Sequence, residues 1–182
     1  MPRILPGMTA KFFVGEGPPV AEPDVVQVAA PDTYIKLAWK TREAFRYALD
    51  FSDWDYVFKC DDDTYVVPER IESLVGEIQP GRQAQWIGSD VLKKDGYTAG
   101  GAGYLLARSI VQALQVAEMP RYDWEGEDMW CGCTARNHVR CLWTPRLCQC
   151  SEPYPAQDND QVTCHGCDPK LMALRHIQFL TA

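Results

Sequence analysis

Short apolar runs alternate along this chain with longer segments in which apolar residues recur every three or four positions. The apolar runs are typical of buried strands and cover residues 11–15, 25–30, 55–60, 86–88 and 104–107. The segments with helical spacing cover residues 33–49, 68–78 and 109–117. This alternation predicts an α/β fold in which a sheet is flanked by helices.

The boundaries of these elements and the remainder of the chain are less regular. Asp32 is expected to cap the first helix, and Pro68 marks the first turn of the second. Beyond Pro120 the helical spacing stops, and we expect an irregular segment, rich in cysteine between residues 131 and 167. A last helix is expected from Asp168 to about Phe179.

Composition limits the classes of function. The chain has 182 residues, which fits a single domain, and 46% of them are hydrophobic. A formal net charge of −7 argues against nucleic acid or an anionic membrane as partner and is compatible with a divalent cation. No segment approaches the roughly 20 apolar residues of a membrane-spanning helix. The sequence contains no signal peptide either, so we expect a cytosolic protein or an incomplete copy of a longer one.

The eight cysteines indicate an oxidising compartment, because seven of them fall between Cys131 and Cys167. Disulfides are the favoured interpretation, and free thiols and structural zinc stay open as alternatives. Only Cys164-x-x-Cys167 has the spacing usual for a zinc ligand pair. Cys60 lies in an apolar run and is expected to be a buried thiol.

Three consecutive carboxylates, Asp61, Asp62 and Asp63, follow a buried strand. Strand alternation would direct Asp61 and Asp63 to one side and Asp62 to the other. Two carboxylates at the carboxyl end of a strand form a hard-oxygen site suited to Mg²⁺ or Mn²⁺, with room for diphosphate oxygens. The alternative is a solvated acidic turn before the helix that begins at Pro68.

Three of the four residues Gly100, Gly101, Ala102 and Gly103 are glycines. Glycine permits close approach to the backbone, so this run could bring a sugar or phosphate against the main chain. A strained turn that enters the next strand is an equal alternative.

Glu127 and Asp128 form a second acidic cluster, between Trp124 and Trp130. A carboxylate near apolar tryptophans could act as the general base of a transfer reaction, and the indole faces could hold sugar rings. The alternative is a solvated acidic loop with both tryptophans in the core. His165 is a candidate further metal ligand, although a histidine without a metal role is more common.

Four motifs in this order resemble one family of enzymes. They are Tyr-Val-Phe-Lys-Cys-Asp-Asp-Asp-Thr-Tyr-Val at 56–66, Gly-Gly-Ala-Gly-Tyr-Leu-Leu at 100–106, Glu127-Asp128, and Val-Thr-Cys-His at 162–165. The family is the inverting β-1,3-glycosyltransferases that include Fringe and core 1 β-1,3-galactosyltransferase. The core 1 branch is the most similar, and the resemblance extends over about residues 11–180.

The resemblance implies a GT-A-like fold, a UDP-sugar donor, Mn²⁺ or Mg²⁺ as cofactor and a β-1,3 linkage to a glycan or glycoprotein acceptor. It assigns Asp61–Asp63 as the DxD motif, with metal bound by Asp61, Asp63 and His165. It makes Asp128 the catalytic base, with Glu127 beside it. The other residues it implies are Asp62, Lys59, Gly100, Gly101, Ala102 and Gly103 for the donor and Trp124, Trp130 and Tyr104 for the substrates.

Members of this family are usually Golgi type II membrane proteins with a further strand and helix before the segment that matches residues 11–15. We therefore expect residues 1–182 to form a single glycosyltransferase domain that lacks those two elements. One alternative is a non-catalytic, truncated member that binds sugar or acts like a chaperone. Another is a Cys/His zinc module, and a homodimer stays open.

Overall fold

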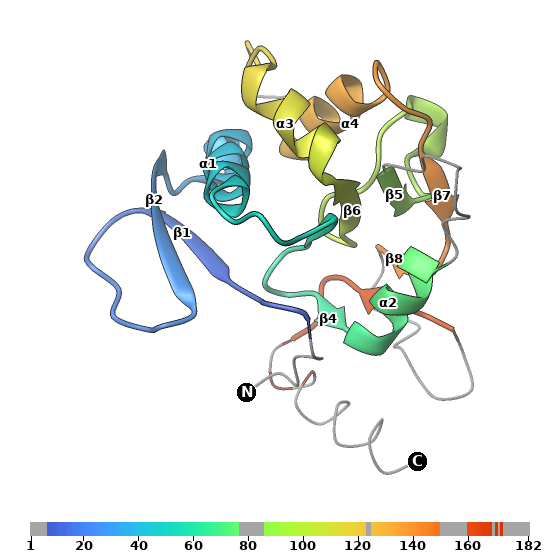
Figure 1. Cartoon of the computed structure of the whole chain (residues 1–182), viewed down its shortest axis with the longest axis horizontal. Helices are drawn as coiled ribbons and strands as arrows, with labels where there is room; N and C mark the ends of the chain where they lie inside the picture. The colour runs from blue at the N-terminus through green and yellow to red at the C-terminus, as the bar shows by residue number, and fades with distance from the viewer. Residues whose placement is uncertain are drawn as a thin grey trace.

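The computed structural model describes residues 7–76, 86–122, 125–149, 160–168, 170 and 172. Figure 1 shows a central sheet with helices on both sides and a small second sheet below it. The mixed α/β architecture with flanking helices confirms the predicted GT-A-like fold class.

The central sheet has four strands in the order β3-β6-β5-β7. They are β3 (Tyr56–Lys59), β6 (Tyr104–Ala107), β5 (Trp86–Ser89) and β7 (Leu142–Thr144). β6 runs antiparallel to both β3 and β5, whereas β5 and β7 are parallel. In the register, Lys59 at the end of β3 pairs with Tyr104 at the start of β6, so the acidic triplet and the glycine run meet at one edge.

Side chains of β5 and β6 alternate between the two faces, and each face is covered. Trp86, Tyr104 and Leu106 pack into one cluster with α1 (Leu37–Leu49), α3 (Arg108–Val116) and α4 (Glu127–Ala135). Ile87 and Leu105 face the opposite cluster, to which α2 (Pro68–Gly76) contributes. Burial on both faces explains why these strands read as continuous apolar runs.

The second sheet brings distant parts of the chain together in the order β4-β9-β8. β4 (Tyr65–Val66) is antiparallel to β9 (Thr163–Cys164), and β9 is parallel to β8 (Leu147–Cys148). Because β4 follows the acidic triplet directly, this sheet places the triplet beside residues 163–167.

A parallel pair, β1 (Phe12–Glu16) and β2 (Val25–Pro31), packs beside α1. Two short 3₁₀ helices, η1 (Tyr34–Lys36) and η2 (Lys93–Asp95), complete the elements. Asp32 does not cap a helix as predicted. Its carboxylate instead accepts a hydrogen bond from the backbone of Gly15 and pairs with Lys40 at 2.6 Å.

The segment beyond Pro120 is more regular than predicted, since it contains α4, β7, β8 and β9. The prediction failed because these strands have only two or three residues and because α4 buries the polar Glu127 and the small Gly132. The helix predicted from Asp168 to Phe179 lies almost wholly outside the described residues. Within the described part of the chain, every helix is too short or too polar to cross a membrane.

The disulfide prediction is wrong for the cysteines that the structure describes, because no disulfide joins any two of them. Cys131 and Cys141 pack in the core that α1, α3 and α4 share, and Cys164 and Cys167 pack around β4 and β9. Buried in this way, the thiols serve as small apolar groups. Cys150 lies outside the described residues.

Candidate metal and nucleotide site

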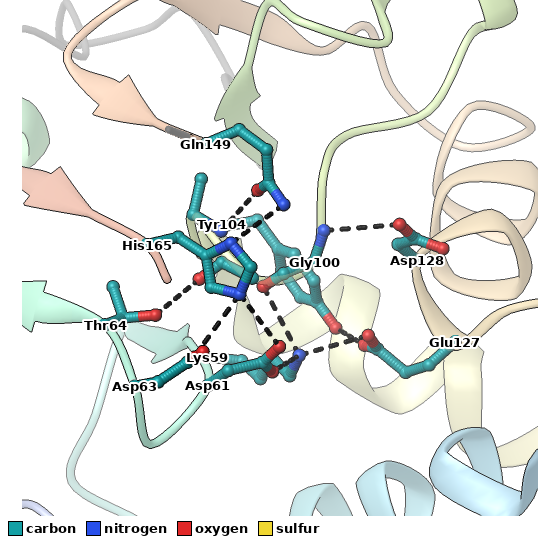
Figure 2. Close-up of polar contacts among 12 residues, drawn as sticks. Lys59, Asp61, Asp63, Thr64, Gly100, Tyr104, Glu127, Asp128, Gln149 and His165 are labelled. Atoms are coloured by element: carbon teal, nitrogen blue, oxygen red, sulfur yellow. Dashed lines mark hydrogen bonds and ion pairs between the residues drawn. The ribbon is translucent and has the colours of Figure 1, made fainter. Parts of the chain in front are cut away.

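Asp61, Asp63 and His165 meet at the junction of the two sheets (Figure 2). Each offers one ligand atom, and these atoms all lie within 4.8 Å of one another. The Nε2 atom of His165 lies 3.3 Å from Oδ1 of Asp63 and 3.7 Å from Oδ2 of Asp61. Among the described residues, no other group of three histidine, cysteine or acidic side chains is close enough to hold a metal ion. The described cysteines therefore form no zinc site of the kind that the zinc-module alternative requires.

A turn, rather than strand alternation, places the two aspartates together. β3 ends at Lys59, and the backbone N–H of Thr64 donates to the carbonyl of Asp61 at 3.2 Å. The backbone N–H of Cys167 then donates to the carbonyl of Asp63 at 2.8 Å, which ties the turn to the segment that carries His165. Asp62, at the tip of this turn, is exposed.

Lys59 lies behind the triplet and joins it to the second acidic cluster. Its Nζ atom is 2.7 Å from Oδ1 of Asp61, 3.1 Å from Oε2 of Glu127 and 3.3 Å from the carbonyl of Gly100. Burial on its own would lower the pKa of Lys59, but the two carboxylates outweigh it and hold the pKa above its ordinary range. Lys59 is therefore a fixed cation inside the site.

Glu127 and Asp128 have different surroundings although they are neighbours at the start of α4. The Glu127 side chain is only 2% exposed and is bound by Lys59 and by the hydroxyl of Tyr104. Burial raises the pKa of Glu127 more than these two partners lower it. The Asp128 carboxylate accepts from the backbone of Gly100 at 3.3 Å and of Met129 at 2.8 Å. Of the two, only Asp128 is not buried.

The glycine run fits tightly between these groups. A Cβ on Gly101 would lie 2.3 Å from Nε2 of His165, and one on Gly100 would lie 2.8 Å from Oε2 of Glu127. Gly103 has a φ of +90°, and a Cβ there would lie 2.4 Å from the ring of Phe58. The run is therefore a close-packed turn in which the imidazole of His165 lies against the backbone.

Two polar residues near the cluster were not among the predicted site residues. The Thr64 hydroxyl donates to the carbonyl of Gly101 at 2.8 Å. Gln149 accepts from the backbone N–H of Ala102 at 2.8 Å and contacts Nδ1 of His165 at 3.0 Å (Figure 2). Gln149 lies in the cysteine-rich stretch, where no spacing or periodicity distinguishes it.

The predicted substrate residues do not join the cluster. Trp130 is 5% exposed, packs in the core and donates its indole N–H to the carbonyl of Glu118, so its face is not offered to a sugar. Tyr104 is fully buried, and its hydroxyl donates a hydrogen bond to the Glu127 carboxylate. Trp124 lies outside the described residues.

The donor set fits a divalent cation. Carboxylate oxygens suit Mg²⁺ and Mn²⁺, and an imidazole nitrogen is a further ligand that Mn²⁺ accepts. The side chains of Asp61, Asp63 and His165 are 33%, 46% and 22% exposed, so the cluster is open to solvent on one side. A metal ion bound there could therefore also contact a ligand from solution.

The mixed α/β fold, with an acidic and histidine cluster at a strand terminus, is consistent with the GT-A-like class of fold. Residues 21–99 match the galactosyltransferase family model, which confirms the predicted resemblance over that segment. The matched segment includes Lys59 and the acidic triplet and stops before Glu127 and His165.

Two curated proteins are similar to part of the chain. Glycoprotein-N-acetylgalactosamine 3-beta-galactosyltransferase 1 of Xenopus laevis is 38% identical over 77 residues, which is 40% of this chain and 21% of that protein. Chondroitin sulfate glucuronyltransferase of Homo sapiens is 34% identical over 86 residues, which is 43% of this chain and 11% of that protein. The matches thus span a small part of each relative.

Proposed function

We propose that this chain is part of an inverting glycosyltransferase that moves a hexose, galactose or an N-acetylhexosamine, from a UDP-sugar to a hydroxyl of a glycan or glycoprotein. The linkage formed is β-1,3, as the resemblance implies. The observation that supports this most directly is the group of Asp61, Asp63 and His165, each with one ligand atom within 4.8 Å of the others. The same proposal places the protein in the lumen of the secretory pathway.

In this proposal the cluster binds Mn²⁺ or Mg²⁺ through the two aspartates and His165. When bound, the cation supplies the Lewis acid that offsets the charge of the leaving nucleoside diphosphate. Lys59 holds the Asp61 carboxylate in place, because its ammonium group lies 2.7 Å from that carboxylate. The glycine run lets the imidazole of His165 lie against the backbone, because a Cβ on Gly101 would lie 2.3 Å from Nε2 of that ring.

The general base of this reaction is Asp128. Inverting transfer requires one group that accepts the proton of the attacking hydroxyl. Glu127 is unsuitable, because it is buried and both of its oxygens are engaged, one by Lys59 and the other by Tyr104. Asp128 is partly exposed, and the backbone N–H groups that hold it leave further lone pairs on its oxygens.

Calorimetric titration with UDP, with and without Mn²⁺, tests this function. We expect binding that requires Mn²⁺ and is lost in Asp63→Ala, because that carboxylate is one of the three metal ligands. Asp53→Ala is the matched control, since it removes the same charge from an exposed residue that precedes β3 and contacts Ser52. The proposed site would be contradicted by UDP binding of equal affinity with and without Mn²⁺, or by an equal loss of UDP affinity in both variants. Mn²⁺-dependent binding without any sugar transfer would identify a non-catalytic sugar-nucleotide binder.

A further inference from the structure

Tyr97 is a partly exposed aromatic residue beside helix α4, and the proposed function does not yet use it. It lies between η2 and β6, three residues before Gly100. The aromatic residues Trp130 and Tyr104, which were predicted to contact substrates, are both buried and present no free ring next to Asp128. The position of Tyr97 relative to Asp128 follows from two contacts between its loop and α4.

The loop that carries Tyr97 runs along α4 and contacts the helix at two points. At one point, the backbone N–H of Gly100 donates to Oδ2 of Asp128 at 3.3 Å. At the other, a Cβ on Gly132 would lie 2.3 Å from the Cβ of Tyr97 and 2.8 Å from its Cα. Asp128 and Gly132 are four residues apart, so they share one face of the helix and lie about 6 Å apart along its axis. The side chain of Tyr97 therefore begins one helical turn from the proposed base.

The charges that act on the phenol agree with this placement. Burial raises the pKa of Tyr97, and the negative charge of Asp128 is the next largest cause, ahead of Asp95 and Cys133. The Tyr97 hydroxyl is therefore within electrostatic reach of the Asp128 carboxylate. Both side chains are partly exposed, so a molecule that reaches Asp128 from solvent can also contact Tyr97.

The backbone on both sides of Tyr97 is constrained. Gly96 has a φ of +80°, a conformation that residues other than glycine rarely adopt. Thr98 is fully buried, and a Cβ on Gly88 would lie 2.5 Å from its hydroxyl oxygen, so Thr98 packs directly against β5. The Cβ of Tyr97 is therefore held in place, and only two side-chain torsions remain to be ordered when a ligand binds, which keeps the entropy cost small.

We propose that Tyr97 is an acceptor-binding residue whose ring packs against the C–H face of a pyranose and so directs a hydroxyl of that sugar to Asp128. This inference rests on the proposed function, because it names what binds beside the proposed base. A pyranose carries apolar C–H groups on its face and hydroxyls around its rim. An aromatic ring covers the apolar face and leaves the hydroxyls free for Asp128. The acceptor class is therefore a sugar, since a serine or threonine hydroxyl has no such face to pack on Tyr97.

Two variants separate this role from simple support of the fold. The acceptors are the methyl glycosides of galactose, N-acetylgalactosamine and N-acetylglucosamine, with the matching UDP-sugars as donors. Tyr97→Leu removes the ring, and we expect the acceptor KM to rise roughly three- to tenfold, the equivalent of one aromatic contact, while the affinity for UDP with Mn²⁺ stays unchanged. Tyr97→Phe keeps the ring and should keep the acceptor KM. Tyr34→Leu is the matched control, because Tyr34 is 92% exposed and belongs to η1.

The contact itself is measured by NMR of the full chain with ¹³C-labelled tyrosine rings, titrated with the same methyl glycosides with and without UDP and Mg²⁺. The Tyr97 signal, assigned by its loss in Tyr97→Phe, should shift during the titration. A Tyr97 signal that none of the three glycosides shifts, or an unchanged acceptor KM in Tyr97→Leu, would overturn the inference. An equal loss of UDP affinity in Tyr97→Leu would do the same, because it would show a structural role. A wild-type protein that binds no UDP with Mn²⁺ would refute the proposed function instead, and the Tyr97 signal would still decide whether a sugar binds there.

Discussion

Gly101→Ala tests whether His165 is a metal ligand without altering any side chain that could bind the metal. The added Cβ would lie 2.3 Å from Nε2 of His165 and 2.5 Å from both Cδ2 and Cε1. Carbon atoms in contact lie about 3.5–4.0 Å apart, so the ring has to move by about 1 Å. Neither side yields easily, since Thr64 holds the carbonyl of Gly101 and Gln149 contacts the ring.

The expected loss of Mn²⁺ affinity follows from how little metal–ligand distances can vary. Metal–ligand distances vary by only about 0.2 Å, so a ring displaced by about 1 Å no longer supplies a ligand. Loss of a group that merely orients a ligand already weakens metal binding about 10- to 100-fold. We therefore expect Mn²⁺ to bind Gly101→Ala at least 10- to 100-fold more weakly, or about 1.4–2.7 kcal/mol.

The assay is electron paramagnetic resonance of free Mn²⁺ in a titration of each purified variant. Gly17→Ala is the matched control, because an added Cβ there meets nothing within 4 Å. In a His165→Ala background, Gly101→Ala should cause no further loss, since its effect acts through the imidazole. Unchanged Mn²⁺ affinity in Gly101→Ala, or the same loss with and without His165, would refute the reasoning.

Three further predictions concern the polar groups behind the cluster. Asp128→Asn should keep Mn²⁺-dependent UDP binding and abolish transfer in a radiolabelled-sugar assay; retained turnover would remove Asp128 from the base role. Lys59→Met leaves the buried Glu127 without its cation and should lower the free energy of unfolding in urea by about 3 kcal/mol, against less than about 1 kcal/mol for Arg46→Met in an exposed pair. Because burial raises the pKa of Glu127 in the folded protein, the native state keeps a proton that the unfolded chain releases above about pH 4.3. Stability should therefore fall as pH rises from there through the folded pKa, and this slope should be reduced in Glu127→Gln; an identical slope would contradict it.

Periodicity predicted the elements that bury ordinary apolar side chains. The strands around Tyr56 and Tyr104 and the helix that begins at Leu37 fill the two faces of the central sheet with such residues, so their spacing was visible. Helix α4 was missed because its buried face carries a carboxylate and a glycine. Gly132 is there because a Cβ would lie 2.3 Å from the Cβ of Tyr97, so the helix approaches more closely than a larger residue allows.

Some residues of the candidate site could be predicted from the sequence, and others could not. Asp61 and Asp63 were predictable because three adjacent carboxylates after a buried strand are unusual in themselves. The partnership of Lys59 with Glu127 was not, since the two residues are 68 positions apart and meet only through the folded sheet. Gln149 was beyond prediction because its role depends on which atoms of Ala102 and His165 it faces.

The charges of Lys59, Glu127 and the two aspartates are distributed unevenly across the cluster. Lys59 lies between Asp61 and Glu127, and the buried Glu127 carboxylate offsets a large part of the positive charge of Lys59. Asp63 lies toward solvent, with its side chain 46% exposed, and its nearest contact in the cluster is His165 at 3.3 Å. Negative charge therefore accumulates on the open side of the cluster, while the buried side is balanced. Under the proposed function, a divalent cation would bind to that excess on the solvent-facing side, where a diphosphate could reach it, while Lys59 balances the buried side.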